Sequence, residues 1–180
     1  MLNLCCSRFA LRPLCAAAVS ALLLASPAVA QTPVALDGFL AGIDRGCESS
    51  SQKKDYELSL YERFGPEPKP NAPLVLPADV ASAFGAPRVE KTDDHLNVNV
   101  PLTATYRGLR LRNLNLVLGL DNGIYSFEIE FDESADKVRA KLSSVVAKSK
   151  KILDKNNEIG ASTALSFKGG KATLSCELSN

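Results

Sequence analysis

A long run of alternating apolar and polar residues between Leu96 and Phe131 constrains the fold of this chain more than any other feature. From Leu96 to Tyr106 every second residue is apolar, which is the period of a strand with one buried face. The alternation resumes after Arg107-Gly108, slips by one residue near Arg112-Asn113, and continues to Phe131. We therefore expect three antiparallel strands, with a two-residue turn at Arg107-Gly108 and a β-bulge at Arg112-Asn113.

Asn122-Gly123 predicts the second turn of this meander, because a type I′ turn needs positive φ at both central residues. Counting outward from a two-residue turn pairs large apolar residues with one another: Leu120 with Tyr125, Leu118 with Phe127, Leu116 with Ile129 and Leu114 with Phe131. All of these residues fall on one side of the sheet. The meander is therefore expected to have one apolar face and one polar face.

The polar face of the predicted meander carries hydrogen-bonding and charged groups: Asn97, Asn99, Thr103, Thr105, Arg110, Arg112, Asn115, Ser126, Glu128 and Glu130. An antiparallel sheet commonly leaves one face in water, so a solvated surface accounts for this pattern. The alternative is a flat recognition surface. Pro101 cannot donate to a neighbouring strand, so its strand is expected to lie at an edge or to be unpaired at that residue.

Residues 1–30 have the layout of a cleaved secretory signal peptide. Arg8 and Arg12 precede a short apolar segment over 14–25, and Ala28-Val29-Ala30 is a small-x-small cleavage site. The apolar segment is about half the roughly 20 residues that a spanning helix needs, so we expect no transmembrane anchor after cleavage. The expected product is a periplasmic or secreted protein in which 31–180 form a single domain.

Charge and cysteine usage narrow the class of protein further. Arg8 and Arg12 are two of the 21 basic residues, so 19 remain after the leader is removed, against 20 acidic residues. This balance argues against a nucleic-acid partner, which normally requires a strong basic excess. Only Cys47 and Cys176 lie beyond residue 30, and two cysteines in an oxidising compartment most often form a disulfide. A redox-active pair is less well supported, because there is no Cys-x-x-Cys motif.

The segment before the meander combines helical and strand-like patterns. Apolar spacing over 36–47 predicts a short amphipathic helix with Cys47 on its buried side. A polar loop over 48–55 and a strand from Tyr56 to about Phe64 are expected next. A short helix over 77–84 and a brief strand over 88–91 complete this part of the chain.

A long helix and a hairpin follow the meander. Asp132 or Ser134 can cap a helix that runs to about Asp154 and carries an apolar stripe. Two alternating segments then flank Gly169-Gly170, and pairing them sets Thr163 opposite Cys176 on the apolar face. The expected fold class is α+β in two layers, an antiparallel sheet made of the meander and this hairpin and packed by the long helix and the short N-terminal helix.

Candidate catalytic residues are few. His95 is the only histidine, so it is the single candidate base for a Ser-His-Asp or Cys-His device. Asp93, Asp94 and His95 lie in an expected loop, and three adjacent residues cannot all point at one metal ion from a strand. Glu128 and Glu130 are about 7 Å apart by strand rise, a spacing compatible with the paired carboxylates of glycosidases. Because zinc-type spacings, a P-loop and a dinucleotide-binding glycine motif are lacking, no catalytic, cofactor or metal site is predicted.

These patterns favour a non-enzymatic binding protein that acts through a surface, such as an inhibitor, an immunity-type protein or an interaction module. Its expected partner is another protein or a component of the cell envelope. The alternative is a small-molecule or lipid carrier, with a cavity between helix and sheet lined by Tyr125, Phe127 and Phe131. A hydrolase that uses Glu128 and Glu130, or His95, comes third.

Overall fold

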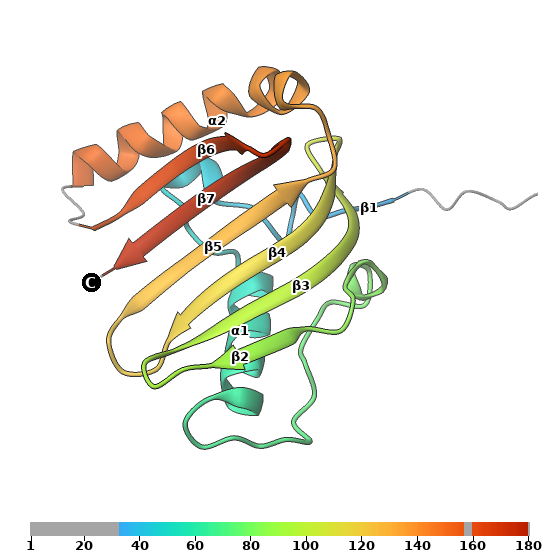
Figure 1. Ribbon diagram of the computed structural model, residues 1–180, viewed down its shortest axis with the longest axis vertical. Coiled ribbons are helices and arrows are strands. Elements are labelled where there is room, and N and C mark those ends of the chain that lie inside the picture. The colour runs from blue at the N-terminus through green and yellow to red at the C-terminus, as the bar shows by residue number, and fades with distance from the viewer. Residues whose placement is uncertain (1–32, 157–159, 180) are drawn as a thin grey trace, which may run out of the picture. The chain divides into compact units, whose positions relative to one another are not determined.

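The computed structural model describes residues 33–156 and 160–179, all of which lie in the second of two compact units, 32–180 (Figure 1). The predicted signal peptide over 1–30 is outside the described residues. The strands are β1 Val34–Ala35, β2 Arg88–Lys91, β3 His95–Tyr106, β4 Leu109–Gly119, β5 Ile124–Phe131, β6 Ser162–Lys168 and β7 Lys171–Ser179. The helices are α1 Ser51–Phe64 and α2 Ala135–Asn156, with two short 3-10 helices, η1 Ile43–Arg45 and η2 Ala81–Ala83.

The strands form one sheet in the order β1-β3-β4-β5-β7-β6, and β2 shares the edge of β3 with β1. Every pair is antiparallel except β1 with β3, which run parallel. Figure 1 looks onto one face of this sheet, with α1 behind it and α2 along β6. The fold is therefore α+β in two layers, as predicted, with the addition of a parallel two-residue strand that sequence patterning had not indicated.

The meander has the predicted faces. Every second residue of β3 from Leu96 to Tyr106 is buried, and the turn at Arg107-Gly108 pairs Tyr106 with Leu109, with positive φ at both turn residues. The predicted bulge is confirmed in the β4–β5 pair, where the register shifts between Leu111 and Asn113. The β3–β4 pair shifts too, between Pro101 and Ala104, so β3 carries an extra residue of its own.

The predicted register at Asn122-Gly123 is wrong by two residues. Leu118 pairs with Tyr125 and Leu116 with Phe127, so residues 120–123 form a four-residue loop instead of a two-residue turn. The loop is held by contacts from elsewhere in the chain, because the backbone N–H of Leu120 and the side-chain amide of Asn122 both donate to the carbonyl of Asp94. A shift of two preserves the direction of every side chain, so the apolar face is unchanged.

Pro101 lies where β3 has no full neighbour on one side. β1 pairs with β3 at Ala104 and Thr105, whereas β2 pairs with it only from Leu96 to Asn99. The carbonyl of Pro101 accepts a hydrogen bond from Gly85 N–H at 2.8 Å. The expectation that this residue is unpaired therefore holds only on the side shared by β1 and β2, because Pro101 pairs with Asn113 of β4 on its other side.

Helix α1 replaces the predicted loop over 48–55 and the predicted strand from Tyr56. The Ser50 hydroxyl accepts a hydrogen bond from Lys53 N–H at 3.1 Å and so caps the helix. Tyr56 and Leu60 are buried, whereas Leu58 between them is 67% exposed. The alternation of these three apolar residues predicts a strand, but so short a run fits a helix as well, and the predicted strand is wrong.

The predicted helix over 36–47 is a series of turns ending in η1. Gly42 and Gly46 have φ of 106° and 80°, which a right-handed helix does not accommodate. Leu36, Leu40 and Ile43 are nevertheless buried as the spacing predicted. The predicted helix over 77–84 is likewise reduced to η2, while the predicted strand over 88–91 is present as β2.

The second half of the chain follows its prediction closely. Helix α2 begins after Ser134 and buries Val138, Leu142, Val145, Ser149 and Leu153. The β6–β7 hairpin turns at Gly169-Gly170 and pairs Thr163 with Cys176. Cys176 is joined by a disulfide to Cys47, 129 residues earlier in the chain, and both cysteines are fully buried.

Candidate functional site

The polar side of the sheet is open along all of its long strands. Both α-helices pack on the apolar face, and no helix of the described part covers the opposite one. The nine residues of the predicted binding surface all lie on this side of the sheet: Asn97, Asn99, Thr103, Thr105, Arg110, Arg112, Asn115, Glu128 and Glu130. We call these residues, together with Ser126, the open face. The open face thus brings together side chains from three strands, as alternation predicted.

Register arranges the centre of the open face into rows across the strands. One row runs from Asn99 through Asn115 and Glu128 to Ser175, and the next from Asn97 through Val117 and Ser126 to Glu177. Residues directly opposite on neighbouring strands have Cβ atoms about 4.5–5.5 Å apart. The first row therefore presents closely spaced hydrogen-bonding groups on four strands, and the second presents them on three, with the apolar Val117 on β4.

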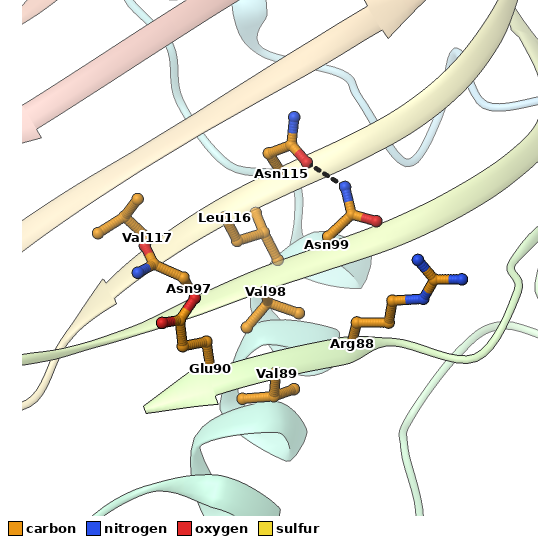
Figure 2. Close-up of a pocket in the computed structure, with 9 residues that line it drawn as sticks. All are labelled: Arg88, Val89, Glu90, Asn97, Val98, Asn99, Asn115, Leu116 and Val117. Carbon is orange, nitrogen blue, oxygen red and sulfur yellow. Dashed lines mark hydrogen bonds between the residues drawn. The ribbon is translucent and has the colours of Figure 1, made fainter. Parts of the chain in front are cut away.

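A shallow groove of about 410 Å³ lies on the open face where β2 meets β3 and β4 (Figure 2). The side-chain amide of Asn99 donates to Oδ1 of Asn115 at 2.5 Å across its middle. Arg88 and Glu90 of β2 stand at one side, and Val117 adds an apolar surface between the polar groups. The groove therefore offers amide, cationic, anionic and apolar contacts within one small area.

The other end of the open face is a network of ion pairs. Arg112 donates to Oδ1 of Asp132 at 2.8 Å, and Arg110 donates to the backbone carbonyl of Asp132 at 2.8 Å. The hydrogen bond from Arg112 holds the pKa of Asp132 below its ordinary value, and the same contact raises the pKa of Arg112. These arginines are committed to partners in the protein itself.

Glu128 and Glu130 share the open face but differ in environment. Glu130 is 5% exposed and lies 3.4 Å from Arg112 and 3.3 Å from Lys171. Glu128 has no hydrogen-bond or ion-pair partner among the described residues, and it is partly exposed. One carboxylate is thus neutralised within the protein, while the other faces solvent at the centre of the sheet.

His95 lies at the start of β3 beside two polar side chains. Its Nδ1 atom is 2.5 Å from Oδ1 of Asp94 and 3.1 Å from the hydroxyl of Thr92. In a catalytic triad, the nucleophilic hydroxyl and the orienting carboxylate contact opposite ring nitrogens of the histidine. Here the Thr92 hydroxyl and the Asp94 carboxylate both approach Nδ1 of His95. The hydrogen bond from Thr92, followed by that from His95, lowers the pKa of Asp94.

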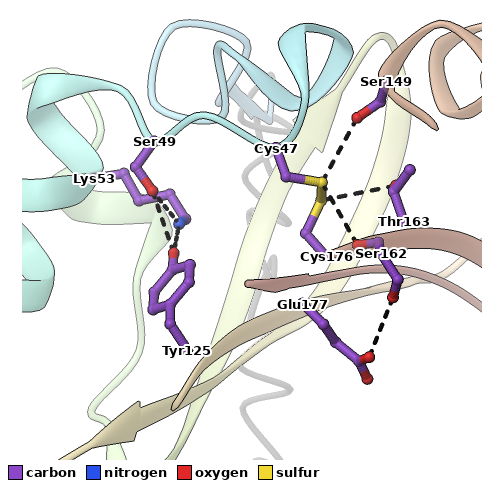
Figure 3. Close-up of a disulfide and its surroundings, with 9 residues drawn as sticks. All are labelled: Cys47, Ser49, Lys53, Tyr125, Ser149, Ser162, Thr163, Cys176 and Glu177. Carbon is purple, nitrogen blue, oxygen red and sulfur yellow. Dashed lines mark hydrogen bonds between the residues drawn. A yellow bond between two sulfur atoms is a disulfide. The ribbon is translucent and has the colours of Figure 1, made fainter. Parts of the chain in front are cut away.

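A buried polar cluster beneath α1 was missed by sequence reasoning (Figure 3). Lys53 is 2% exposed and its ammonium donates to the hydroxyls of Ser49 and Tyr125 and to Oε1 of Glu57. The Tyr125 hydroxyl in turn donates to Oε1 of Glu57 at 2.6 Å. Burial lowers the pKa of Lys53 and raises that of Tyr125. The four-residue spacing of Lys53 and Glu57 was the available signal, since it joins charges on one side of a helix.

The disulfide lies next to this cluster, between the η1 segment and β7 (Figure 3). The hydroxyl of Ser149 on α2 is 3.7 Å from Sγ of Cys47, and the hydroxyl of Thr163 on β6 is 3.8 Å from Sγ of Cys176. The bond therefore ties the N-terminal segment, the long helix and the C-terminal hairpin together at one point.

The three aromatic residues expected to line a carrier cavity differ in their surroundings. Phe127 and Phe131 are 1% and 2% exposed and form part of the packed core. Tyr125 instead lines an open groove of about 370 Å³ between α1 and the end of the β4–β5 hairpin. We call this the α1 groove; its lining is Lys54, Glu57, Leu58, Tyr61, Leu118, Gly119, Gly123, Ile124 and Tyr125.

Within 33–156 and 160–179, His, Cys, Asp and Glu side chains form no group of three placed to hold a metal ion. None of the helices in those ranges combines the length and the apolar character needed to cross a membrane. No family model, curated protein sequence or solved structure matches the chain.

Proposed function

We propose that this chain is an exported, non-enzymatic binding protein that recognises another protein or a cell-envelope component through the open face of its sheet. The observation that carries the proposal is the state of the polar groups there. Within the described residues, the side chains of Asn97, Ser126 and Glu128 have no hydrogen-bond partner, although they stand in closely spaced rows. A partner can therefore pair with them without breaking contacts inside the protein.

The kind of partner follows from charge and from the lining of the open face. Its free charges are mixed, with Arg88 and Glu90 at the groove and Glu128 at the centre. The whole chain has a formal net charge of +1, whereas a nucleic-acid surface is normally strongly basic. No aromatic side chain lines the groove of the open face, so a stacking platform for a sugar is lacking there. These features favour a polypeptide partner.

Export to an oxidising compartment is supported by two independent features. The layout of residues 1–30 is that of a signal peptide, and the Cys47–Cys176 disulfide belongs to the chemistry of oxidising compartments. The proposed location is therefore the periplasm or the extracellular space.

Site-specific photo-crosslinking tests the proposal. A benzophenone side chain placed at Asn99 or at Ser126 reports on the open face, and one placed at the exposed Lys151 of α2 is the matched control. We expect a crosslinked species of defined mass in the cell-envelope fraction from both open-face positions and none from position 151. A second substitution, Asn115→Arg, projects a long cation into the same rows and is expected to remove that species while leaving the circular dichroism spectrum unchanged.

Two results would contradict the proposal. Equal crosslinking from Lys151 and from the open face would show that adduct formation does not depend on this surface. Hydrolysis of ester, glycoside or peptide substrates by the purified protein, lost on His95→Ala or Glu128→Gln, would show instead that the chain is an enzyme.

A further inference from the structure

Exposed apolar residues line the α1 groove, between α1 and the end of the β4–β5 hairpin. Three large hydrophobic residues are clearly exposed in the described part of the chain: Leu58 at 67%, Val75 at 49% and Ile124 at 39%. Leu58 and Ile124 both line the α1 groove. Since this protein buries most of its other large apolar side chains, two exposed residues that line one groove indicate a site that another molecule covers.

The walls of the α1 groove are held in place by hydrogen bonds at both ends. The Tyr61 hydroxyl donates to the carbonyl of Leu120 at 2.7 Å and joins α1 to the hairpin loop. At the other end, the Tyr125 hydroxyl donates to Glu57 at 2.6 Å. Between these ties, Leu58, Leu118 and Ile124 line an apolar trough. Its volume of about 370 Å³ lies within the range of about 300–1,000 Å³ typical of small-molecule sites.

The charges at the α1 groove favour an anionic ligand. Lys54 and Glu57 are the two charged residues of its lining, but Oε1 of Glu57 already accepts from Lys53 and Tyr125 behind the wall. The ammonium of Lys54 has no carboxylate within ion-pair distance in the described part of the chain. Glu57 compensates the charge of Lys53, so the charge of Lys54 remains uncompensated at this end of the apolar trough.

We propose that the α1 groove binds a single-chain amphipathic anion of the fatty-acid class. The acyl chain lies in the trough against Leu58, Leu118 and Ile124, where it covers apolar surface that water now contacts. The carboxylate lies at the end of the groove beside Lys54 and pairs with its ammonium. This site is separate from the open face, so it does not rest on the protein-binding function proposed above.

Titration of the purified protein with dodecanoate tests this site, by calorimetry and by backbone amide NMR shifts. We expect saturable binding of one dodecanoate per chain, with the largest shifts at Leu58, Gly123 and Ile124. Lys54→Glu should weaken binding about threefold to tenfold, as the loss and reversal of one exposed charge pair predicts. The same variant should gain affinity for dodecyltrimethylammonium, a cation with a chain of equal length.

Matched variants separate the site from general hydrophobic binding. Leu58→Gln should weaken dodecanoate binding about tenfold, because the ligand loses an apolar contact. Val75→Gln changes an exposed apolar residue outside the α1 groove, and Lys151→Glu reverses an exposed charge on α2; both should bind dodecanoate as the wild type does. The side chains changed are all exposed, so folding is preserved and is checked by the unbound amide spectrum.

Three outcomes would overturn the proposal. The first is the absence of saturable binding, which would leave the exposed trough as a contact surface for another protein. The second is binding that Leu58→Gln and Val75→Gln weaken equally. The third is a set of shifts centred away from the hairpin loop. None of these outcomes bears on crosslinking at the open face, so the two proposals fail independently.

Discussion

Lys53 and Glu57, four residues apart on helix α1, form an ion pair of 2.7 Å, and the side chain of Lys53 is only 2% exposed. The ammonium also lies 3.9 Å from the centre of the Phe127 ring. A charge in such surroundings depends on its partners, because burial disfavours the ionised form and lowers the pKa of Lys53. The pair lies within α1, and it reaches the sheet through the hydroxyl of Tyr125 on β5, which bonds to both members.

The first prediction concerns removal of one partner. Glu57→Gln leaves the ammonium of Lys53 buried without a counter-charge, so we expect the free energy of unfolding to fall by about 3 kcal/mol. The double variant Lys53→Met, Glu57→Gln should recover most of this loss. Urea denaturation followed by far-ultraviolet circular dichroism measures both. Glu62→Gln on the same helix removes an exposed partner of Lys69 and should leave the midpoint unchanged; equal losses from both Gln variants would contradict the prediction.

The second prediction is a loss of stability at high pH that depends on Tyr56. Burial raises the pKa of Tyr56 from 10.0 to about 12. Above pH 10 the unfolded chain releases this proton while the folded chain keeps it, so the stabilisation is fully present below pH 10 and is lost as the pH rises towards 12. The free energy of unfolding of the wild type should fall by about 1.4 kcal/mol more per pH unit than that of Tyr56→Phe over this window. Parallel curves for the two proteins between pH 9.5 and about 11.5 would refute the assignment.

The third prediction concerns the disulfide. A bond across 129 residues removes much of the conformational freedom of the unfolded chain, and the chain-entropy model puts its contribution at about 4–5 kcal/mol as an upper value. The double variant Cys47→Ala, Cys176→Ala should lose up to this amount of the free energy of unfolding, measured by urea denaturation. A reducing agent should lower the urea midpoint of the wild type and leave that of the variant unchanged. Thiol labelling of the unreduced, denatured wild type should find no free cysteine among residues 31–180; two labelled thiols there would show that the bond does not form.

The fourth prediction tests the turn before η1. Gly42 has φ of 106°, and a Cβ atom there would lie 2.3 Å from the carbonyl oxygen of Glu48. We expect Gly42→Ala to cost on the order of 2 kcal/mol or more, through backbone strain and this close contact. Gly108→Asn is the control, because Gly108 also has positive φ but nothing lies within 4 Å of the added atom. A smaller loss for Gly42→Ala than for Gly108→Asn would be inconsistent with the structure.

Features set by local patterning could be predicted, and features set by distant contacts could not. Alternation from Leu96 to Tyr106 depends on a period of two, so the buried and open faces of the meander followed directly. The register at Asn122 could not be predicted in this way, because the loop is held by the carbonyl of Asp94 and the hydroxyl of Tyr61. These residues come from segments that the hairpin sequence does not contain.

Helix α1 was missed for a related reason. Its buried side includes Lys53, which pattern reasoning assigns to solvent because a lone lysine is rarely buried. Only the pairing with Glu57 and Tyr125 makes that burial possible, and Tyr125 lies on a strand far along the chain. With Lys53 counted as polar, the segment loses its helical stripe and the apparent alternation of Tyr56, Leu58 and Leu60 remains.

The candidate site shows the same division. The nine open-face residues were placed together by alternation alone, and the structure confirms that they share one side of the sheet. Glu130 is paired with Lys171 of β7, whereas Glu128 has no such partner in the described residues. This difference could not be predicted, because Lys171 approaches Glu130 only when the C-terminal hairpin joins the sheet. The α1 groove could not be predicted, because one of its walls is the helix that was read as a strand.

The position of Cys176 limits when the disulfide can form during synthesis. Ribosomes make the chain from its N-terminus, so Cys47 exists as an unpaired thiol until 129 more residues have been added. The strand that carries Cys176 lies between β5 and β6 although it is the last in the sequence, so β6 has no place in the sheet until that strand arrives. Covalent closure therefore cannot precede the synthesis of β7, and a chain that stops before β7 has an open sheet edge at β5 and lacks the cysteine that pairs with Cys47.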